Sequence, residues 1–230
     1  MANLYNKAGL VNIPVGYQDG FLYNIKPTDN TLGFRFNRNS AATRVNKEGL
    51  IEEVLSDKPR IDYTDSLTSP SLLLEPQRTN SVTYSEDFSQ WSKSGVAIES
   101  GYLAPDGSNN AYKVTKETSN AYIYLPDVSA SDSARTIWAK TVSGTGTVNL
   151  CSYGQNTNNN FTITPQWQRF EVNSTTTATG ATNFYGVDFR FTEANPLSEV
   201  IIWGAQTEAG DYATSYIPTD GSTVTRVQET

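Results

Sequence analysis

The sequence predicts an all-β protein whose main body is an antiparallel β-sandwich or barrel. From residue 81 onward, short segments with alternating apolar and polar residues recur at a spacing of roughly 8–12 residues. Turns rich in Gly, Asn, Ser and Asp separate these segments, as in Ser143–Gly146 and Gln155–Asn160. No segment keeps a helical period beyond two turns, so strands are expected to supply the fold.

The best-patterned strand is Tyr185–Phe191, whose apolar side chains fall on one face while Asp188 and Arg190 fall on the other. Val200–Trp203 is apolar on both faces, which indicates a central strand. A helical turn is expected only in Tyr84–Trp91, where Ser85 is suited to cap it. The segments expected to form strands are Gly95–Glu99, Ala111–Lys116, Ala121–Leu125, Ala134–Val142, Thr147–Tyr153, Asn160–Ile163, Gln168–Val172, Asn183–Phe191 and Val200–Ala205.

Residues 34–80 are expected to form a β-hairpin followed by an extended wrapping segment. Phe34-Arg35-Phe36 alternates like a half-buried strand, Asn46–Gly49 reads as a turn, and Leu50–Val54 reads as the second strand. Further along, Leu72–Leu74 is an apolar run between two prolines, too short for a helix, and it predicts a buried strand. This run joins the preceding segment to the sandwich.

The first 33 residues carry no period, because glycines and prolines interrupt every apolar patch. We predict an irregular N-terminal segment that lies against the sandwich or a neighbouring subunit. The expected organisation is 1–33 irregular N-terminal segment, 34–80 hairpin and wrapping segment, 81–219 sandwich, and 220–230 C-terminal tail.

Composition and charge narrow the functional classes. The chain has 230 residues, a formal net charge of -7 and a pI near 4.7. This acidity argues against binding nucleic acid or anionic lipid, both of which need a basic surface. No apolar run is long enough to span a membrane, and the N-terminus lacks the apolar core of a signal peptide.

Catalytic groups are scarce. The chain has no histidine and one cysteine, Cys151, which excludes Ser-His-Asp and Cys-His catalysis, His-containing zinc sites and an intrachain disulfide. We interpret Cys151 as a core residue and expect no enzymatic activity. A carboxylate pair for glycoside cleavage remains open; its candidates are Glu86, Asp87, Asp188, Glu199 and Glu208.

Charged residues recur around the hairpin, and we interpret Glu75, Arg78, Arg44 and Arg60 as structural pairs, with an anion-binding cluster as the alternative. Glu75 and Arg78 are each other's nearest candidate partners. A short sequence echo, Ala42–Val45 and Val224–Val227, indicates either two similar edge strands or coincidence, and we favour coincidence.

Two ligand hypotheses remain. Flat aromatic rings stack on sugars, and the candidates for such a face are Trp91, Tyr122, Tyr124, Tyr153 and Trp167, with core packing or subunit contact as the alternative. No cofactor is expected beyond a structural calcium. Its oxygen ligands would come from Asp127, Ser129, Ser131 and Asp132, a loop that lacks the glycine and distal glutamate of an EF-hand, or from Glu86, Asp87 and Glu208.

Two stretches carry a resemblance to known proteins. Phe36–Ile51, continued by Pro59–Tyr63 and Leu72–Asn80, resembles a module widespread in virion proteins of tailed bacteriophages, including head and tail fibres. Ile201–Thr219 resembles the closing strand and tail of the carbohydrate-binding-module-like jelly rolls that follow this module. The resemblance implies a jelly-roll sandwich, no catalysis, and use in virion assembly or host-surface binding.

The expected function is therefore that of a structural protein of a phage virion, a head-fibre, decoration or tail-appendage subunit that docks through its N-terminus. The expected partners are other virion proteins and further copies of the chain, with a trimer as one arrangement. The expected location is the virion, assembled in the bacterial cytoplasm. The alternative is a glycan-binding adhesin module, with a host-surface glycan as its partner; a hydrolase is a third hypothesis.

Overall fold

The computed structural model describes residues 14–18, 21–24, 33–126, 133–153, 159–174, 184–190 and 194–230. The chain forms two compact units: Met1–Gln77 with Arg226–Thr230, and Arg78–Thr225. The expected C-terminal tail, 220–230, is thus divided between them.

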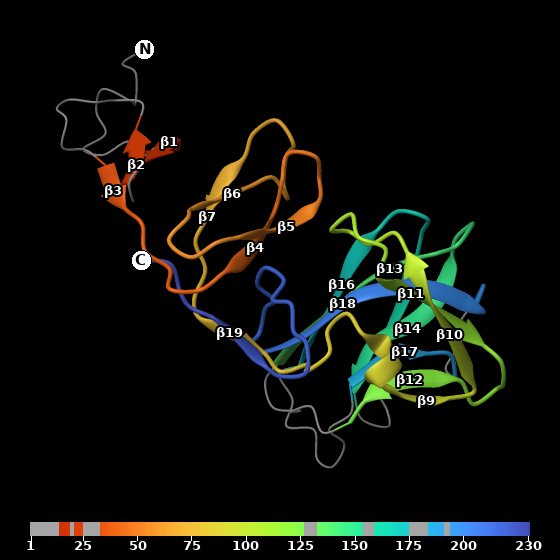
Figure 1. The fold of residues 1–230 in the computed structure, drawn as a ribbon. Coiled ribbons are helices and arrows are strands. Elements are labelled where there is room, and N and C mark those ends of the chain that lie inside the picture. Colours follow the sequence, from red (N-terminus) through yellow and green to blue (C-terminus); the bar gives the residue numbers. More distant parts are fainter. Residues whose placement is uncertain are drawn as a thin grey trace. The chain divides into compact units, whose positions relative to one another are not determined.

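The Arg78–Thr225 unit is a sandwich of two five-stranded antiparallel sheets (Figure 1). The first sheet has the order β10 (Val96–Tyr102), β11 (Ala111–Lys116), β18 (Glu199–Ala209), β13 (Ser133–Lys140), β16 (Gln168–Ser174). The second has the order β15 (Asn160–Ile163), β14 (Gly146–Tyr153), β17 (Phe184–Asp188), β12 (Tyr122–Leu125), β9 (Ser92–Ser94). Successive strands from β12 to β18 repeatedly change sheet, as in a jelly roll.

The core lies between the two sheets. Side chains from both sheets face inward, so Ile137 and Ile202 of the first sheet meet Leu150 and Val187 of the second in one buried cluster. The central position predicted for Val200–Trp203 is confirmed, because β18 is buried continuously from Val200 to Glu208. Cys151 is fully buried in the same core, as expected.

The outer face of the first sheet is also covered. Trp138, Trp203 and Tyr216 pack together there, with ring centroids 4.7–5.4 Å apart. At the edge of this layer, β8 (Arg78–Asn80) pairs with β19 (Val224–Arg226). The segment that follows β8 bonds to β18, since the Ser81 amide donates to the Thr207 carbonyl.

The predicted helical turn is a single 3-10 turn, Phe88–Gln90. Its cap is Asp87 rather than Ser85, because the Asp87 carboxylate accepts from the Ser89 amide while Ser85 is buried against Thr219. All nine segments expected to form strands contain strands. The ends of Ala111–Lys116 and Asn160–Ile163 are as predicted, and the ends of the other seven are shifted. β9 was missed because Ser-Lys-Ser has no apolar residue to give a pattern.

In the other unit, the expectation of an irregular segment over 1–33 is wrong in part. β1 (Pro14–Gln18), β2 (Phe21–Asn24) and β3 (Gly33–Arg35) form a three-stranded antiparallel sheet. Pro14 is the first residue of its strand, a position where proline is tolerated, so it does not break the sheet. Phe34 and Arg35 belong to β3 and not to the hairpin.

Two short hairpins complete this unit. β4 (Ala42–Val45) pairs with β5 (Ile51–Val54) around the predicted turn, and β6 (Arg60–Asp62) pairs with β7 (Ser71–Leu73). The predicted burial of Leu72–Leu74 is wrong. β7 has β6 as its partner in a two-stranded sheet, and the side chain of Leu74 is 60% exposed.

Candidate functional site

A buried cluster of charges lies in the Met1–Gln77 and Arg226–Thr230 unit. Arg38, at the start of the resemblance, and Arg60, on β6, both direct their guanidinium groups to the carboxylate of Glu229. Glu75 pairs with Arg60 at 2.9 Å and with Arg226 at 2.7 Å. The side chains of Arg38, Arg60 and Glu229 are completely buried.

Glu229 holds the cluster to the backbone as well. Its Oε1 accepts from Arg60 Nε at 2.7 Å, and its Oε2 accepts from the Glu75 amide at 2.9 Å. The next residue, Thr230, exchanges two backbone hydrogen bonds with Asn37. Burial lowers the pKa of the Arg38 guanidinium, and the hydrogen bond to Glu229 opposes this effect. Residues 226–230 therefore complete the unit that Met1–Gln77 forms.

The structure shows which partners the charged residues have that the sequence predicts to form structural pairs. Glu75 does not take Arg78 as its partner but pairs with Arg60 and Arg226, while the Arg78 guanidinium lies over the Tyr212 ring at 5.1 Å. Arg44 pairs with Glu52 across the β4–β5 hairpin. Sequence proximity suggested the wrong partner for Glu75, because its actual partners, Arg60 and Arg226, lie further away along the chain.

The five aromatic candidates do not form one face. Trp91 is 2% exposed and packs on Phe88 and Phe184 in the core, while its indole N–H donates to the Tyr84 carbonyl. It cannot stack on a ligand without unfolding, so its inclusion in a sugar platform is wrong. Its burial follows from its position just before β9, where the chain enters the second sheet.

Tyr122 and Tyr124 do lie together. They occupy alternate positions of β12, on the face opposite the core residue Ile123, and their ring centroids are 5.6 Å apart. Arg190 lies over the Tyr122 ring at 4.1 Å and pairs with Asp188 at 2.7 Å. This half-exposed pair is the part of the predicted platform that the fold brings together.

The remaining two aromatic candidates lie elsewhere. Trp167 precedes β16 of the other sheet, donates to the Leu103 carbonyl and carries Lys140 over its ring at 5.0 Å. Tyr153 ends β14, and its side chain lies outside the described residues.

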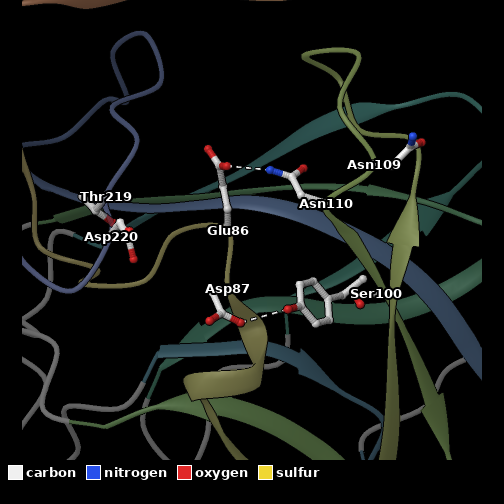
Figure 2. Close-up of a pocket in the computed structure, with 8 residues that line it drawn as sticks. Glu86, Asp87, Ser100, Asn109, Asn110, Thr219 and Asp220 are labelled. Carbon is white, nitrogen blue, oxygen red and sulfur yellow. Dashed lines mark hydrogen bonds between the residues drawn. The ribbon is translucent and has the colours of Figure 1, made fainter.

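A pocket of about 450 Å³ opens beside the first sheet, within the sandwich unit (Figure 2). In Figure 2, Glu86 and Asp87 lie between Thr219 and Asp220 on one side and Ser100 and Asn109 on the other. The pocket is lined by Glu86, Asp87, Ser100, Asn109, Asn110, Tyr112, Thr219 and Asp220.

Hydrogen bonds order one wall of this pocket. The Asn110 amide donates to Glu86 at 2.7 Å and accepts from the Trp203 indole at 2.8 Å. The Tyr216 hydroxyl lies 2.9 Å from the other Glu86 oxygen. The Tyr112 hydroxyl donates to Asp87 at 2.9 Å. The wall is therefore held in place before any ligand arrives.

The two acids of this wall have different electrostatic environments. Burial raises the pKa of Glu86, and the hydrogen bond from Tyr216 opposes that effect. Hydrogen bonds from Ser89, Tyr112 and Gln90 to Asp87 outweigh its burial and lower its pKa. Burial and the neighbouring Glu86 carboxylate raise the pKa of Tyr216.

Glu86 makes stability depend on pH in a defined direction. The pKa of Glu86 in the folded protein lies above the usual 4.5. Its contribution to the unfolding free energy is therefore fully present at pH values below the pKa of the unfolded state. This contribution is lost as the pH rises through the pKa of the folded state. We expect wild-type unfolding free energy to fall, relative to that of Glu86→Gln, as the pH rises above the usual glutamate pKa of 4.5. Urea unfolding followed by tryptophan fluorescence at each pH measures the difference. Glu117→Gln, at an exposed position, is the control, and a difference that stays constant with pH would contradict the expectation.

The other acidic candidates do not converge on these two. Glu208 is buried and accepts hydrogen bonds from the Thr214 amide and hydroxyl, and Asp188 pairs with Arg190. Glu199 lies at the start of β18. Among the described residues, no group of three acidic or sulfur ligands is arranged to hold a metal ion. The candidate calcium loop, Asp127 to Asp132 with Ser129 and Ser131, lies outside the described residues.

The pocket residues beyond Glu86 and Asp87 were missed from the sequence. Asn109 and Asn110 follow a tight turn, and Asp220 lies about 110 residues further along, so no local spacing connects them. Their meeting depends on the pairing of β10 with β11 and on the isolated bridge between Tyr84 and Asp220.

The comparisons with known proteins find a weak structural similarity and no family. No family model and no curated protein matches the chain. Among solved structures, the chain is similar to the CBM22-1–GH10 modules of the Clostridium thermocellum N-terminal endo-1,4-beta-D-xylanase 10B complexed with xylohexaose, at 12% identity and a TM-score of 0.39. The match covers 60% of this chain and 29% of that chain. The β-sandwich assignment rests on the sheets themselves. No helix among the described residues has the length and apolarity needed to cross a membrane.

Proposed function

We propose that the chain is a non-enzymatic structural protein of a bacteriophage virion, a head-fibre, decoration or tail-appendage subunit that docks through its N-terminus and displays a β-sandwich. The supporting observation is the charge cluster. Arg38, Arg60 and Glu75 come from three separate parts of the phage-like motif and meet at one buried point. The residues that carry the resemblance therefore stabilise the fold of this module, as expected for a structural unit that several virion proteins share.

Exposed leucines support a docking role for the same unit. Leu55, Leu67 and Leu74 are 52–65% exposed, and Leu50 is 39% exposed, all within the Met1–Gln77 segment. Exposed apolar side chains favour contact with other protein surfaces where they gather into one patch. The partners that we propose are other virion proteins and further copies of this chain, within the particle.

Removing residues 1–33 tests the docking proposal. We expect the truncated chain to fold and to be absent from purified particles, because the anchoring contacts are gone. Mass spectrometry of particles assembled with truncated or full-length protein measures incorporation, and tryptophan fluorescence verifies that the sandwich is intact. Incorporation of the truncated chain at the full-length level would contradict N-terminal docking.

A second candidate function, glycan binding for host-surface attachment, is favoured by one observation. Tyr122 and Tyr124 are neighbours on the outer face of β12, with Arg190 and Asp188 beside them. Aromatic faces next to paired charges suit a sugar, which presents an apolar ring face and polar hydroxyls.

Alanine substitutions at Tyr122 and Tyr124 test whether this face binds a glycan. On a glycan array, each is expected to reduce a wild-type signal by tenfold or more if the face carries binding, because the stacking surface is lost. Tyr63→Ala, in the other unit, serves as the control. An unchanged signal in both variants would remove this face from consideration.

A further inference from the structure

We infer that the pocket lined by Glu86, Asp87, Asn109 and Asp220 binds a neutral sugar residue. This inference deepens the glycan-binding candidate and rests on it, but it places the ligand beside the first sheet instead of on the tyrosine pair of β12. The volume of about 450 Å³ lies in the range of small-molecule sites, which is roughly 300–1,000 Å³.

Side chains available for a ligand come from three separate segments. Ser100 lies on β10, Asn109 precedes β11, and Asp220 follows the buried Thr219 near the C-terminal end of the unit. All three are exposed at the pocket, whereas Glu86, Asn110 and Tyr112 are already bonded within the ordered wall. A fixed polar wall facing several accessible hydrogen-bonding groups is an arrangement that recognises hydroxyl groups without large reorganisation.

The chemistry of the lining selects the ligand class. The carboxylates of Asp87 and Asp220 accept hydrogen bonds, while the amide of Asn109 and the hydroxyl of Ser100 also donate them. A sugar hydroxyl both donates and accepts, so it can satisfy both kinds of group. An ammonium ion donates only, so it can bond to the carboxylates but makes no use of the Asn109 N–H donors, which stay bonded to water.

Charge excludes acidic sugars. The lining contains three carboxyl groups, those of Glu86, Asp87 and Asp220, and no lysine or arginine. A uronic or sialic acid would bring its carboxylate close to Asp87, whose lowered pKa keeps it ionised. Like charges at short range disfavour binding, so a neutral sugar is the class that fits.

The test uses the full chain and a panel of immobilised neutral, amino and acidic oligosaccharides, followed by calorimetric titration of the strongest binder. The pocket variant is Asn109→Ala/Asp220→Ala, which changes two exposed side chains. The matched control, Asn173→Ala/Asp211→Ala, changes two exposed side chains outside the pocket. Ser100→Arg is a second pocket variant that fills the space. Tryptophan fluorescence confirms folding of each.

We expect wild-type protein to bind a neutral oligosaccharide and the control to bind normally. Both pocket variants are expected to bind at least about tenfold more weakly, Asn109→Ala/Asp220→Ala because it loses two hydrogen bonds and Ser100→Arg because its side chain occupies the ligand's space. Binding that is lost in Tyr122→Ala but kept in both pocket variants would overturn the pocket assignment and leave glycan binding in place. Preference for amino or acidic sugars would overturn the neutral class. Absence of binding to every sugar would overturn the pocket and the glycan-binding candidate together, without touching the virion proposal.

Discussion

Replacing Glu229 by alanine is expected to destabilise the Met1–Gln77 and Arg226–Thr230 unit by about 3–5 kcal/mol. The carboxylate of Glu229 is completely buried and bonds to Arg38, to Arg60 and to the Glu75 amide. Removing it leaves two buried guanidinium groups facing a cavity. The cost arises mainly from the buried charge of Arg38, which loses its ion pair with Glu229, while Arg60 keeps its pair with Glu75. A buried ion pair itself contributes little net stability.

The measurement must distinguish the two units. All four tryptophans, Trp91, Trp138, Trp167 and Trp203, belong to the Arg78–Thr225 unit, so their fluorescence reports on the sandwich. Amide hydrogen exchange over residues 36–75 reports on the other unit. We expect protection there to fall by at least about a hundredfold, since each 1.4 kcal/mol changes an equilibrium tenfold.

Glu53→Ala provides the matched control for Glu229, because Glu53 is an exposed glutamate on β5 of the same unit. Its effect is expected to stay within about 0.5 kcal/mol. Glu229→Gln separates charge from shape, since it fills the space but removes the ion pairs that Arg38 and Arg60 make with Glu229, while Arg60 keeps its pair with Glu75; we expect it to be nearly as damaging as the alanine variant. Normal protection in the alanine variant would show that the cluster does not hold this unit together.

Local patterns revealed the strands of the sandwich but not their partners. Gln168–Val172 and Val200–Ala205 could be recognised because each strand buries alternate or all residues of a short run, and that information lies in the run itself. The same holds for the β4–β5 hairpin, whose turn residues are contiguous.

Long-range charge pairing could not be read from the sequence in the same way. Glu75 and Arg78 are three residues apart, so proximity made them candidate partners, whereas the actual partners are Arg60 and Arg226. One weak signal was present. The echo between Ala42–Val45 and Val224–Val227 marks two short strands in which Arg44 and Arg226 each pair with a glutamate.

Burial explains the errors among the aromatic candidates. A tryptophan is suited both to a core and to a sugar platform, and only the completed fold decides between them. Trp91 is enclosed because the 3-10 turn and β17 close over its two faces through Phe88 and Phe184. Tyr122 and Tyr124 remain half-exposed because the β12 pleat directs Ile123 inward and its two neighbours outward.

Asn80, the last residue of the phage-like motif, is the position in the sandwich where a single polar substitution is expected to cost most. Its side chain is fully buried and makes four hydrogen bonds to backbone groups. The amide nitrogen donates to the carbonyls of Ala205 and Ile217, and the amide oxygen accepts from the N–H groups of Val82 and Thr207. One side chain thereby ties β8, β18 and the covering segment 213–219 to one another.

Replacing Asn80 by alanine leaves four buried backbone groups without these bonds, each of which costs about 1–3 kcal/mol when unsatisfied. Allowing for relaxation, we expect the sandwich to lose about 3–5 kcal/mol, seen as a lower urea midpoint of tryptophan fluorescence with an unchanged slope. Asn173→Ala, at an exposed position of β16, is expected to change stability by less than about 0.5 kcal/mol.

A second substitution, Asn80→Asp, tests the two hydrogen bonds that the Asn80 side chain donates. Asn80→Asp keeps the acceptor for Val82 and Thr207 but loses both donors and places a carboxylate beside the carbonyls of Ala205 and Ile217. If the donors matter as the geometry requires, the aspartate variant is at least as unstable as the alanine variant at neutral pH, and it recovers in part when acid protonates the carboxyl group. An aspartate variant with wild-type stability at neutral pH would mean that the bonds to Ala205 and Ile217 do not hold the covering segment to the sheet.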